Sequence, residues 1–379
     1  MQQQSLQQRE TRIDFFRALC LITIFINHVP GNVFEAFTHR NFGFSDSAEA
    51  FVLMSGIAAG MVYGSRFEPG RRIASWVRAW KRAGRLYVTH IATTVGSLAI
   101  FAGVALYTQR PMLLKQLNID TMIDNTPAAL VGLATMSHQI GYNNILSLYV
   151  VLMLLLPLML FIAKRSIPLM LTLSAAVWLS AGLFQVAPRD FPRDGVWFLN
   201  PLSWQLVFAI GVAGSMLAKR PEGFKLPRWS LWASGAYLLL ALVWVKWPLW
   251  GLETKAGLPF VFAGFDKTYE SLPRLLHVLA LATLAYSLKP ILRIAKVSYD
   301  NPLAVMGRHS LPVFVSGTLL AMLAQTVRWV SPPSNLLDAA LVIGGVLLQF
   351  ALAYALEASK KLESSGKPPA PPVLQPVGA

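Results

Sequence analysis

The stretch that decides the fold is residues 14–28, which read Asp14-Phe-Phe-Arg17-Ala-Leu-Cys-Leu-Ile-Thr-Ile-Phe-Ile-Asn-His28. It places ionisable side chains within a predicted membrane-spanning helix. Arg17 and His28 are eleven positions apart, which is roughly three helical turns and about 16 Å of rise, so both side chains project from one face. Ionisable groups at membrane depth are costly unless they face water or a partner, so both residues are functional candidates. Asp14, one turn before Arg17, is the expected partner of its guanidinium group.

The composition of the whole chain indicates an integral membrane protein. Of its 379 residues, 55% are hydrophobic and 13% are charged, which is too apolar for an ordinary soluble domain. The single cysteine, Cys20, excludes an intramolecular disulfide and a CxxC motif, and we interpret it as a small buried apolar residue. The net charge of +15 resides in short segments between apolar runs. Membrane topology therefore explains the charge, and no nucleic-acid partner is expected.

Apolar windows of about 18 to 22 residues predict ten membrane-spanning helices. The fold class is therefore all-α, a polytopic membrane protein with both termini cytoplasmic. The predicted helices cover residues 13–31, 48–64, 86–107, 144–163, 167–187, 203–218, 229–247, 272–288, 309–330 and 335–357. A polar segment, 1–12, precedes this single transmembrane domain, 13–357. The Pro-rich tail, 358–379, is expected to be cytoplasmic and disordered.

Lys and Arg residues orient the predicted helices. With a cytoplasmic N-terminus, the segments on that side hold 22 of the 33 basic residues and the opposite loops hold seven. Such an excess is typical of the cytoplasmic side of a membrane. The long outer segment 108–143 has room for an interfacial or re-entrant helix. The two halves of the chain show no matching interrupted helices, which disfavours an inverted-repeat transporter.

Asp46 and Glu49 stand at the start of the second predicted helix. The loop before them is short, so we expect both acids to share the outer end of the bundle with His28. A carboxylate beside an imidazole fixes its tautomer and raises its basicity, as a general base acting on a hydroxyl requires. The Asp-x-x-Glu spacing also fits a helix capping box. Both acids therefore have a structural alternative.

A basic face is predicted between the second and third spans. Its members recur at helical spacing and combine arginines with two indoles: Arg71, Arg78, Arg82, Arg85, Trp76 and Trp80. Guanidinium groups bind phosphates bidentately, and an indole can stack on a base, so the face suits coenzyme A. An anchor lying on anionic lipid has the same composition, and this alternative stays open.

Further polar residues are predicted at the outer ends of other spans. They are Asn41 in the first outer loop, Asn143 and Asn144 at the fourth span, Trp204 and Gln205 at the sixth, and Arg274 and His277 at the eighth. Amides and aromatic rings suit the hydroxyls of a sugar, although Trp and Tyr are also ordinary interface residues. The chain lacks Walker A, HExxH, Gly-x-Ser-x-Gly and EF-hand patterns. Nucleotide hydrolysis, metalloprotease and serine-esterase functions therefore find no support, and no metal is expected.

Several of these stretches together resemble the OpgC-type membrane proteins, which are associated with succinylation of osmoregulated periplasmic glucans. The resemblance extends more distantly to the acyltransferase-3 superfamily. It spans residues 12 to 312 approximately and rests on the Arg17-to-His28 spacing, Gly43-Phe-Ser-Asp-Ser-Ala-Glu49, Phe51-x-x-x-Ser55-Gly56, the basic run 78–85, Ile145-Leu-Ser-Leu-Tyr149, Asn200-Pro-x-x-Trp204-Gln205 and Gly307-Arg-His-Ser-Leu311.

The resemblance implies an O-acyltransferase of the bacterial inner membrane. Such an enzyme passes an acyl group, succinyl in this family, from cytoplasmic acyl-coenzyme A to a glucan hydroxyl on the periplasmic side. It also implies that Arg17 and His28 are essential. Ser147 stands where the family pattern leads us to expect proline, and Asn143-Asn144 stand where we expect an acid. These departures leave Glu49 as the leading carboxylate.

The predicted mechanism assigns each set of residues a role. The coenzyme phosphates bind the inner basic face, and the pantetheine arm passes between helices and past Arg17. His28 acts as general base on the acceptor hydroxyl or transiently takes the acyl group, oriented by Glu49 or Asp46. The predicted coenzyme-binding residues are Arg71, Arg78, Trp80, Arg82 and Arg85. The predicted acceptor-binding residues are Asn41, Asn144, Trp204, Gln205, Arg274 and His277.

Three alternatives stay open. A secondary transporter would use Arg17, His28 and Glu49 to bind an anionic solute and a proton. An O-acetyltransferase for another cell-envelope polysaccharide would differ in its acyl group and acceptor. A non-catalytic membrane subunit would organise glucan synthesis without chemistry of its own. The expected partners are acyl-coenzyme A, the glucan and the lipid bilayer, and homo-oligomerisation is left open.

Overall fold

The computed structural model describes residues 10–247 and 249–365. Helices dominate these residues, and no extended strand occurs among them. The long helices are α1 (Thr11–Asn27), α2 (Ser47–Tyr63), α3 (Arg72–Thr108), α6 (Asn144–Ala163), α7 (Ile167–Leu183), α8 (Pro201–Ala218), α9 (Arg228–Lys246), α11 (Leu272–Ser287), α14 (Ser310–Val330) and α15 (Asn335–Ser365). The shorter ones are α4 (Asp120–Asp124), α5 (Thr126–Ala134), α10 (Phe260–Ala263), α12 (Lys289–Ala295) and α13 (Pro302–Arg308).

The protein is a multi-pass membrane protein by the length and apolar character of its helices. Among the described residues, seven helices can each cross a membrane, or eight if α11 and the α12 helix bent 83° from it form one span. The predicted number of ten is therefore not confirmed, although a helix overlaps each predicted stretch. Helices α1 and α7 have 17 residues each, about 26 Å of rise, which is shorter than a bilayer core of about 30 Å. The cytoplasmic location of the termini stays a prediction.

Two predicted boundaries differ in the structure. The basic segment that we expected between the second and third spans is the first part of α3, which has 37 residues and is about 55 Å long. Because that length exceeds a bilayer core, one end of α3 extends beyond it. Residues 358–365 of the predicted tail continue α15 to Ser365, and the rest of that tail, 366–379, lies outside the described residues.

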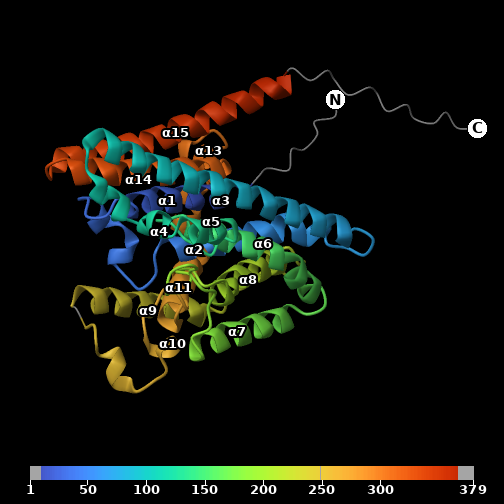
Figure 1. The fold of residues 1–379 in the computed structure, drawn as a ribbon. Coiled ribbons are helices and arrows are strands. Elements are labelled where there is room, and N and C mark those ends of the chain that lie inside the picture. Colours follow the sequence, from blue (N-terminus) through green and yellow to red (C-terminus); the bar gives the residue numbers. More distant parts are fainter. Residues whose placement is uncertain (1–9, 248, 366–379) are drawn as a thin grey trace, which may run out of the picture.

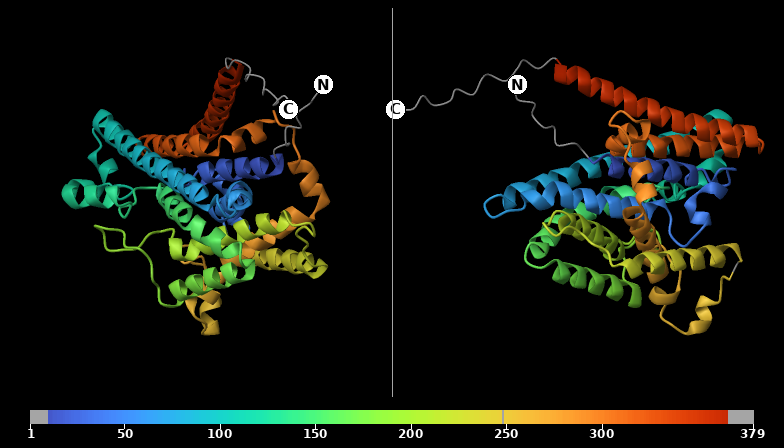
Figure 2. Two further views of the ribbon diagram at one scale, coloured as in Figure 1. Left: turned by 90° about the vertical axis from the view of Figure 1, so that its right-hand side faces the viewer. Right: turned by 180° about the vertical axis from the view of Figure 1, so that it is seen from behind.

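The long helices form two groups joined at the centre (Figures 1 and 2). Helices α1, α3, α13, α14 and α15 pack together on one side, and α7, α8, α9 and α11 lie on the other. Helix α2 connects the groups because it packs on both α1 and α8, and α6 lies between α3 and α7. The centre of the molecule is therefore surrounded by helices from both ends of the chain.

Glycines set the close crossing of α2 and α8. A Cβ atom at Gly56 would collide with the backbone carbonyl of Phe208, and one at Gly211 would collide with the carbonyl of Leu53. Small residues allow such close approach between membrane helices, where apolar side chains gain little by leaving lipid. The Ser55-Gly56 pair of the second span thus has a packing role at Gly56, and it aims Ser55 at the space beside α6.

Candidate functional site

A cavity of about 260 Å³ lies between α1, α2, α3, α6, α8 and α14. Its charged residues are Arg17 from α1 and Arg82 from α3. The rest of the lining is mostly apolar and comprises Phe51, Ser55, Ala58, Ala59, Val62, Tyr63, Leu86, Ile145, Leu146, Tyr149, Met153, Phe208, Ser310, Leu311 and Phe314. Two arginines that we assigned to different tasks, one catalytic and one coenzyme-binding, therefore share one space.

The cavity is long along α2. Its lining on that helix runs from Phe51 to Tyr63, a rise of about 18 Å. Pockets for drug-sized ligands hold about 300–1,000 Å³, so a cavity of about 260 Å³ accommodates a narrow chain better than a bulky group. The cavity is suited to an extended, largely uncharged arm with an anionic group within reach of an arginine.

Arg17 is held by its own helix. Its Nη1 atom lies 3.9 Å from Oδ1 of Asp14, which confirms the predicted pairing. The backbone of Asp14 is itself fixed, because Gly307 of α13 packs so closely that a Cβ atom there would collide with the Asp14 carbonyl. The close packing at Gly307 therefore fixes the position of the first turns of α1, which carry Arg17.

The basic face of α3 is divided in the structure. Arg82 is half-buried and lines the cavity, whereas Arg71, Arg78 and Arg85 are exposed. Trp80 lies edge-on to Trp76 with the ring centres 5.9 Å apart, and its Nε1 donates to the carbonyl oxygen of Leu154 over 3.3 Å. The predicted basic face is thus an exposed cationic surface, and Arg82 is its member that lines the cavity.

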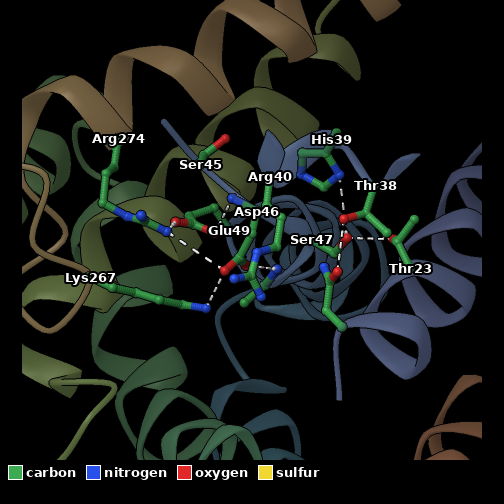
Figure 3. A network of polar contacts seen from close by, with 12 residues as sticks. Thr23, Thr38, His39, Arg40, Ser45, Asp46, Ser47, Glu49, Lys267 and Arg274 are labelled. Atoms are coloured by element: carbon green, nitrogen blue, oxygen red, sulfur yellow. Dashed lines mark hydrogen bonds and ion pairs between the residues drawn. The ribbon is translucent and has the colours of Figure 1, made fainter. Parts of the chain in front are cut away.

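Asp46 and Glu49 form the capping box that the sequence allows. The Ala48 amide donates to Oδ1 of Asp46 over 2.8 Å, and the Asp46 amide donates to Oε2 of Glu49 over 3.0 Å. Each acid also binds a cation from a distant segment: Lys267 pairs with Asp46, and Arg274 pairs with Glu49. Figure 3 shows the four side chains converging in one cluster. The predicted capping role is therefore confirmed, and charge pairing with Lys267 and Arg274 is a structural role that the sequence did not predict.

A charge cluster at the predicted outer end of the bundle, the outer charge cluster, consists of Asp46, Glu49, Lys267, Glu270 and Arg274. Burial disfavours the charge on Asp46, but the cations of Lys267 and Arg274 outweigh it and hold its pKa below its usual range. Glu270 is fully buried, and neither of its carboxylate oxygens has a hydrogen-bond partner among the residues described. Burial, reinforced by the charge of Glu49, raises the pKa of Glu270 well above its usual range. Burial therefore favours the protonated form of the Glu270 carboxyl group.

His28 ends α1 and is fixed from two directions. Its ring stacks on Tyr142, with centroids 4.2 Å apart and planes at 15°. Its backbone carbonyl accepts from Nε2 of Gln325 over 2.6 Å, and Arg328 binds the carbonyls of Pro30 and Gly31. Across residues 10–247 and 249–365, no hydrogen bond or ion pair joins the His28 ring to Asp46 or Glu49. In place of the expected carboxylate contact, the imidazole stacks on Tyr142, and both acids pair with cations.

A hydroxyl network links the outer end of α1 to α2 (Figure 3). Thr23 of α1 hydrogen-bonds Ser47 of α2, whose Oγ lies 3.5 Å from Nδ1 of His39. Ser47 precedes Phe51 by four residues, so this network begins about 6 Å along α2 from the end of the cavity. Thr23 lies between Arg17 and His28 in the chain. The cavity-lining residues and the hydroxyl network therefore follow one another along both α1 and α2.

The other predicted acceptor residues differ in their surroundings. His277 accepts from the Ser45 hydroxyl over 2.7 Å, so it and Arg274 hold the stretch 43–49 against α11. Trp204 is fully buried and donates to the carbonyl of Lys267, beside the cluster. Gln205 is buried and donates to Ser174 of α7. Asn41 bonds Glu35 within its own loop, and Asn144 is the first residue of α6.

Sequence reasoning missed Lys267, Glu270 and His39. Lys267 and Glu270 precede an apolar helix and read as ordinary loop charges. The available signal is their i, i+3 and i+7 spacing with Arg274, which concentrates charge at one helix start. His39 lies two residues before Asn41 in the first outer loop, and burial lowers the pKa of its imidazole. Its Nδ1 atom lies 3.5 Å from the Ser47 hydroxyl oxygen.

These features define a multi-pass helical membrane protein with a two-arginine cavity inside its bundle and a charge cluster beside it. The chain belongs to the OpgC family, described as OpgC protein, which matches residues 9–361. This match confirms the resemblance inferred from the motifs, whereas the more distant likeness to the acyltransferase-3 superfamily stays a prediction. No curated protein and no solved structure matches the chain.

Proposed function

We propose that this protein is an inner-membrane O-acyltransferase that transfers a succinyl group from cytoplasmic succinyl-coenzyme A to hydroxyls of an osmoregulated periplasmic glucan. Membership of the OpgC family supports an acyltransferase acting on such glucans. The single observation that carries the donor assignment is the shared cavity of Arg17 and Arg82. It connects a cationic surface to the interior of the bundle.

The coenzyme docks at the end of the cavity marked by Arg82. The exposed Arg71, Arg78 and Arg85 supply guanidinium groups for its phosphates, and the Trp76–Trp80 pair offers an aromatic face to its adenine. Arg82 contacts the coenzyme where its pantetheine arm joins the phosphates and enters the cavity. A lipid anchor alone needs no arginine directed into a cavity, which is why we favour the coenzyme.

The pantetheine arm then occupies the cavity. The apolar lining suits its methylene and methyl groups, and the length of about 18 Å along α2 suits an extended chain. Arg17 binds the terminal carboxylate of the succinyl group, held in place by Asp14. An acetyl group offers Arg17 no such partner, so this contact favours a dicarboxylic acyl group.

His28 performs the transfer at the outer end. It removes the proton from the glucan hydroxyl, whose oxygen bonds to the acyl carbon as the carbon–sulphur bond breaks, and coenzyme A leaves as a thiol after taking up a proton. The stack on Tyr142 positions the imidazole, and the bond from Gln325 holds the His28 backbone carbonyl. Asp46 and Glu49 assist by holding the start of α2 against α11 through Lys267 and Arg274.

The proposal is tested with purified protein in lipid nanodiscs, given succinyl-coenzyme A and glucan. Free thiol, measured with a chromogenic disulfide, should appear together with succinylated glucan and in equal amount. His28→Ala should abolish both signals while retaining normal insertion. A protein that consumes no thioester but moves an anionic solute across proteoliposomes would instead be a transporter, and the proposed function would be wrong.

A further inference from the structure

Two hydroxyl groups meet inside the otherwise largely apolar cavity. Tyr149 of α6 and Ser55 of α2 both line it, and their oxygens lie 2.7 Å apart. The Tyr149 hydroxyl also lies 3.0 Å from the backbone carbonyl of Phe51. The aromatic rings of Phe51 and Phe314 stack close by, with centroids 6.3 Å apart. The two hydroxyl groups therefore form a polar pair surrounded by apolar side chains, one turn along α2 from Phe51.

The hydrogen-bond inventory of this pair leaves a donor for a ligand. Ser55 and Tyr149 carry one hydroxyl proton each, and the Phe51 carbonyl is the backbone acceptor within reach. That carbonyl lies inside α2 and already accepts the backbone N–H of Ser55, four residues further on. Tyr149 donates to both the Phe51 carbonyl and the Ser55 oxygen, so the Ser55 proton is free to point into the cavity. A ligand acceptor can thus be bound without leaving a buried group unpaired.

We propose that Ser55 and Tyr149 form a subsite that binds the carbonyl oxygen of an acyl thioester. The subsite rests on the proposed function, because that function brings a thioester into the cavity. A neutral hydroxyl donor suits an uncharged carbonyl, whereas the two arginines suit anionic ends. Ser55 lies eight residues from Tyr63 on α2, about 12 Å from that end of the cavity. An arm entering beside Arg82 and Tyr63 therefore brings its far end to Ser55.

Aromatic rings surround the subsite. Phe51 and Phe314 both line the cavity beside the hydroxyl pair, and the Phe51 ring lies 5.9 Å from that of Tyr149. The outer network of Thr23 and Ser47 begins one helical turn further along α2. A thioester bound at Ser55 thus lies about two helical turns along α2 from Ser47 of this network.

Amide carbonyls of the pantetheine arm are a second source of the same acceptor chemistry, and the experiment separates the two. The probes are a ketone analogue of the acyl-coenzyme, in which a methylene group replaces the sulphur, and a thioether analogue that lacks the acyl carbonyl oxygen. Both retain the amides. Affinities are measured by calorimetry on purified protein. The wild-type protein should bind the ketone about fivefold more tightly than the thioether, which is the strength of one neutral hydrogen bond.

Ser55→Ala should reduce this ratio to about one while leaving the thioether affinity unchanged, which also shows that the variant is folded. Tyr149→Phe should reduce it as well, because it removes the hydroxyl that donates to the Ser55 oxygen and orients the Ser55 proton toward the cavity. Tyr237→Phe is the matched control, since it removes a tyrosine hydroxyl that binds the Pro273 carbonyl over 2.9 Å outside the cavity. Ser55→Cys, a weak donor, is a second variant at the same position.

The outcomes separate the subsite from the function. A wild-type ratio of about one, or a fivefold ratio that survives in Ser55→Ala, Ser55→Cys and Tyr149→Phe, overturns the subsite and leaves the acyltransferase intact. A fivefold ratio in the wild-type protein and in Tyr237→Phe that falls to about one in Ser55→Ala and is reduced in Tyr149→Phe, with the thioether affinity unchanged in every variant, supports it. If the wild-type protein binds neither analogue, the donor assignment itself is wrong and the subsite falls with it.

Discussion

Arg17 and Arg82 line one cavity, although they belong to helices α1 and α3 and are 65 positions apart in the chain. One comes from a helix that carries Asp14 and His28 as further polar candidates, the other from the long basic helix. Their meeting joins the interior of the bundle to the cationic surface. The donor half of the proposed mechanism depends on this relationship.

The first prediction concerns Arg82. Replacing it with glutamine removes the inward cation of the basic face, so the KM for acyl-coenzyme A should rise about tenfold with little change in kcat. Lys81→Gln is the matched control, because Lys81 is the neighbouring residue, is exposed and does not line the cavity. Equal effects of the two substitutions would mean that the face acts only by its total charge.

The second prediction concerns the pair between Arg274 and Glu49. The Glu49 side chain is fully buried and that of Arg274 is 11% exposed, so removing one partner leaves the other without compensation. Arg274→Ala should lower the free energy of unfolding by about 3 kcal/mol. Thermal unfolding in detergent measures the loss, with the exposed Arg193→Ala as control. Unchanged stability would show that water replaces the pair.

The third prediction concerns the pH dependence produced by Glu270. Its pKa is raised in the folded protein, so the folded state retains a proton that the unfolded state releases near pH 4.3. Stability should therefore fall as the pH rises from about 4.3 to the raised pKa. Glu270→Gln should flatten this decline in the melting temperature, whereas the exposed Glu222→Gln should not. A decline that persists unchanged in Glu270→Gln contradicts the assignment.

The fourth prediction concerns the support of His28. Arg328 binds the carbonyls of Pro30 and Gly31 and pairs with Asp338 at 2.7 Å. Lysine keeps the charge but cannot reproduce this forked geometry. Arg328→Lys should therefore lower kcat about tenfold and leave the KM for the donor unchanged. Arg110→Lys, which alters a similar bond to the Trp329 carbonyl, is the control. A rise in donor KM instead would place the effect at the cavity.

Hydropathy predicted the helices well because a long apolar run leaves the backbone few alternatives in a membrane. It missed the first part of α3, since Arg72 to Arg85 form a charged and amphipathic stretch that no apolar window includes. The count of ten spans exceeded what α1 and α7 support by length. Local sequence predicts a helix more readily than it predicts whether that helix crosses the bilayer.

The candidate site was predictable where its contacts are local. The Asp14–Arg17 pair and the capping box of Asp46 and Glu49 follow from spacings of three residues. The partners Lys267 and Arg274 lie more than 200 positions away, and no local pattern relates such segments. For the same reason, the sequence could not show whether Glu49 contacts the imidazole of His28 or the guanidinium group of Arg274. Only the packing of α2 against α11 decides it.

The central claim is that an acyl group passes from a donor on one side of the membrane to a glucan on the other. The most direct measurement uses proteoliposomes with radiolabelled succinyl-coenzyme A enclosed and glucan outside, for the population oriented with its basic face inward. Label should accumulate on the external glucan, and coenzyme A thiol should remain inside. Label that reaches the glucan only when donor and glucan share one compartment would contradict the account.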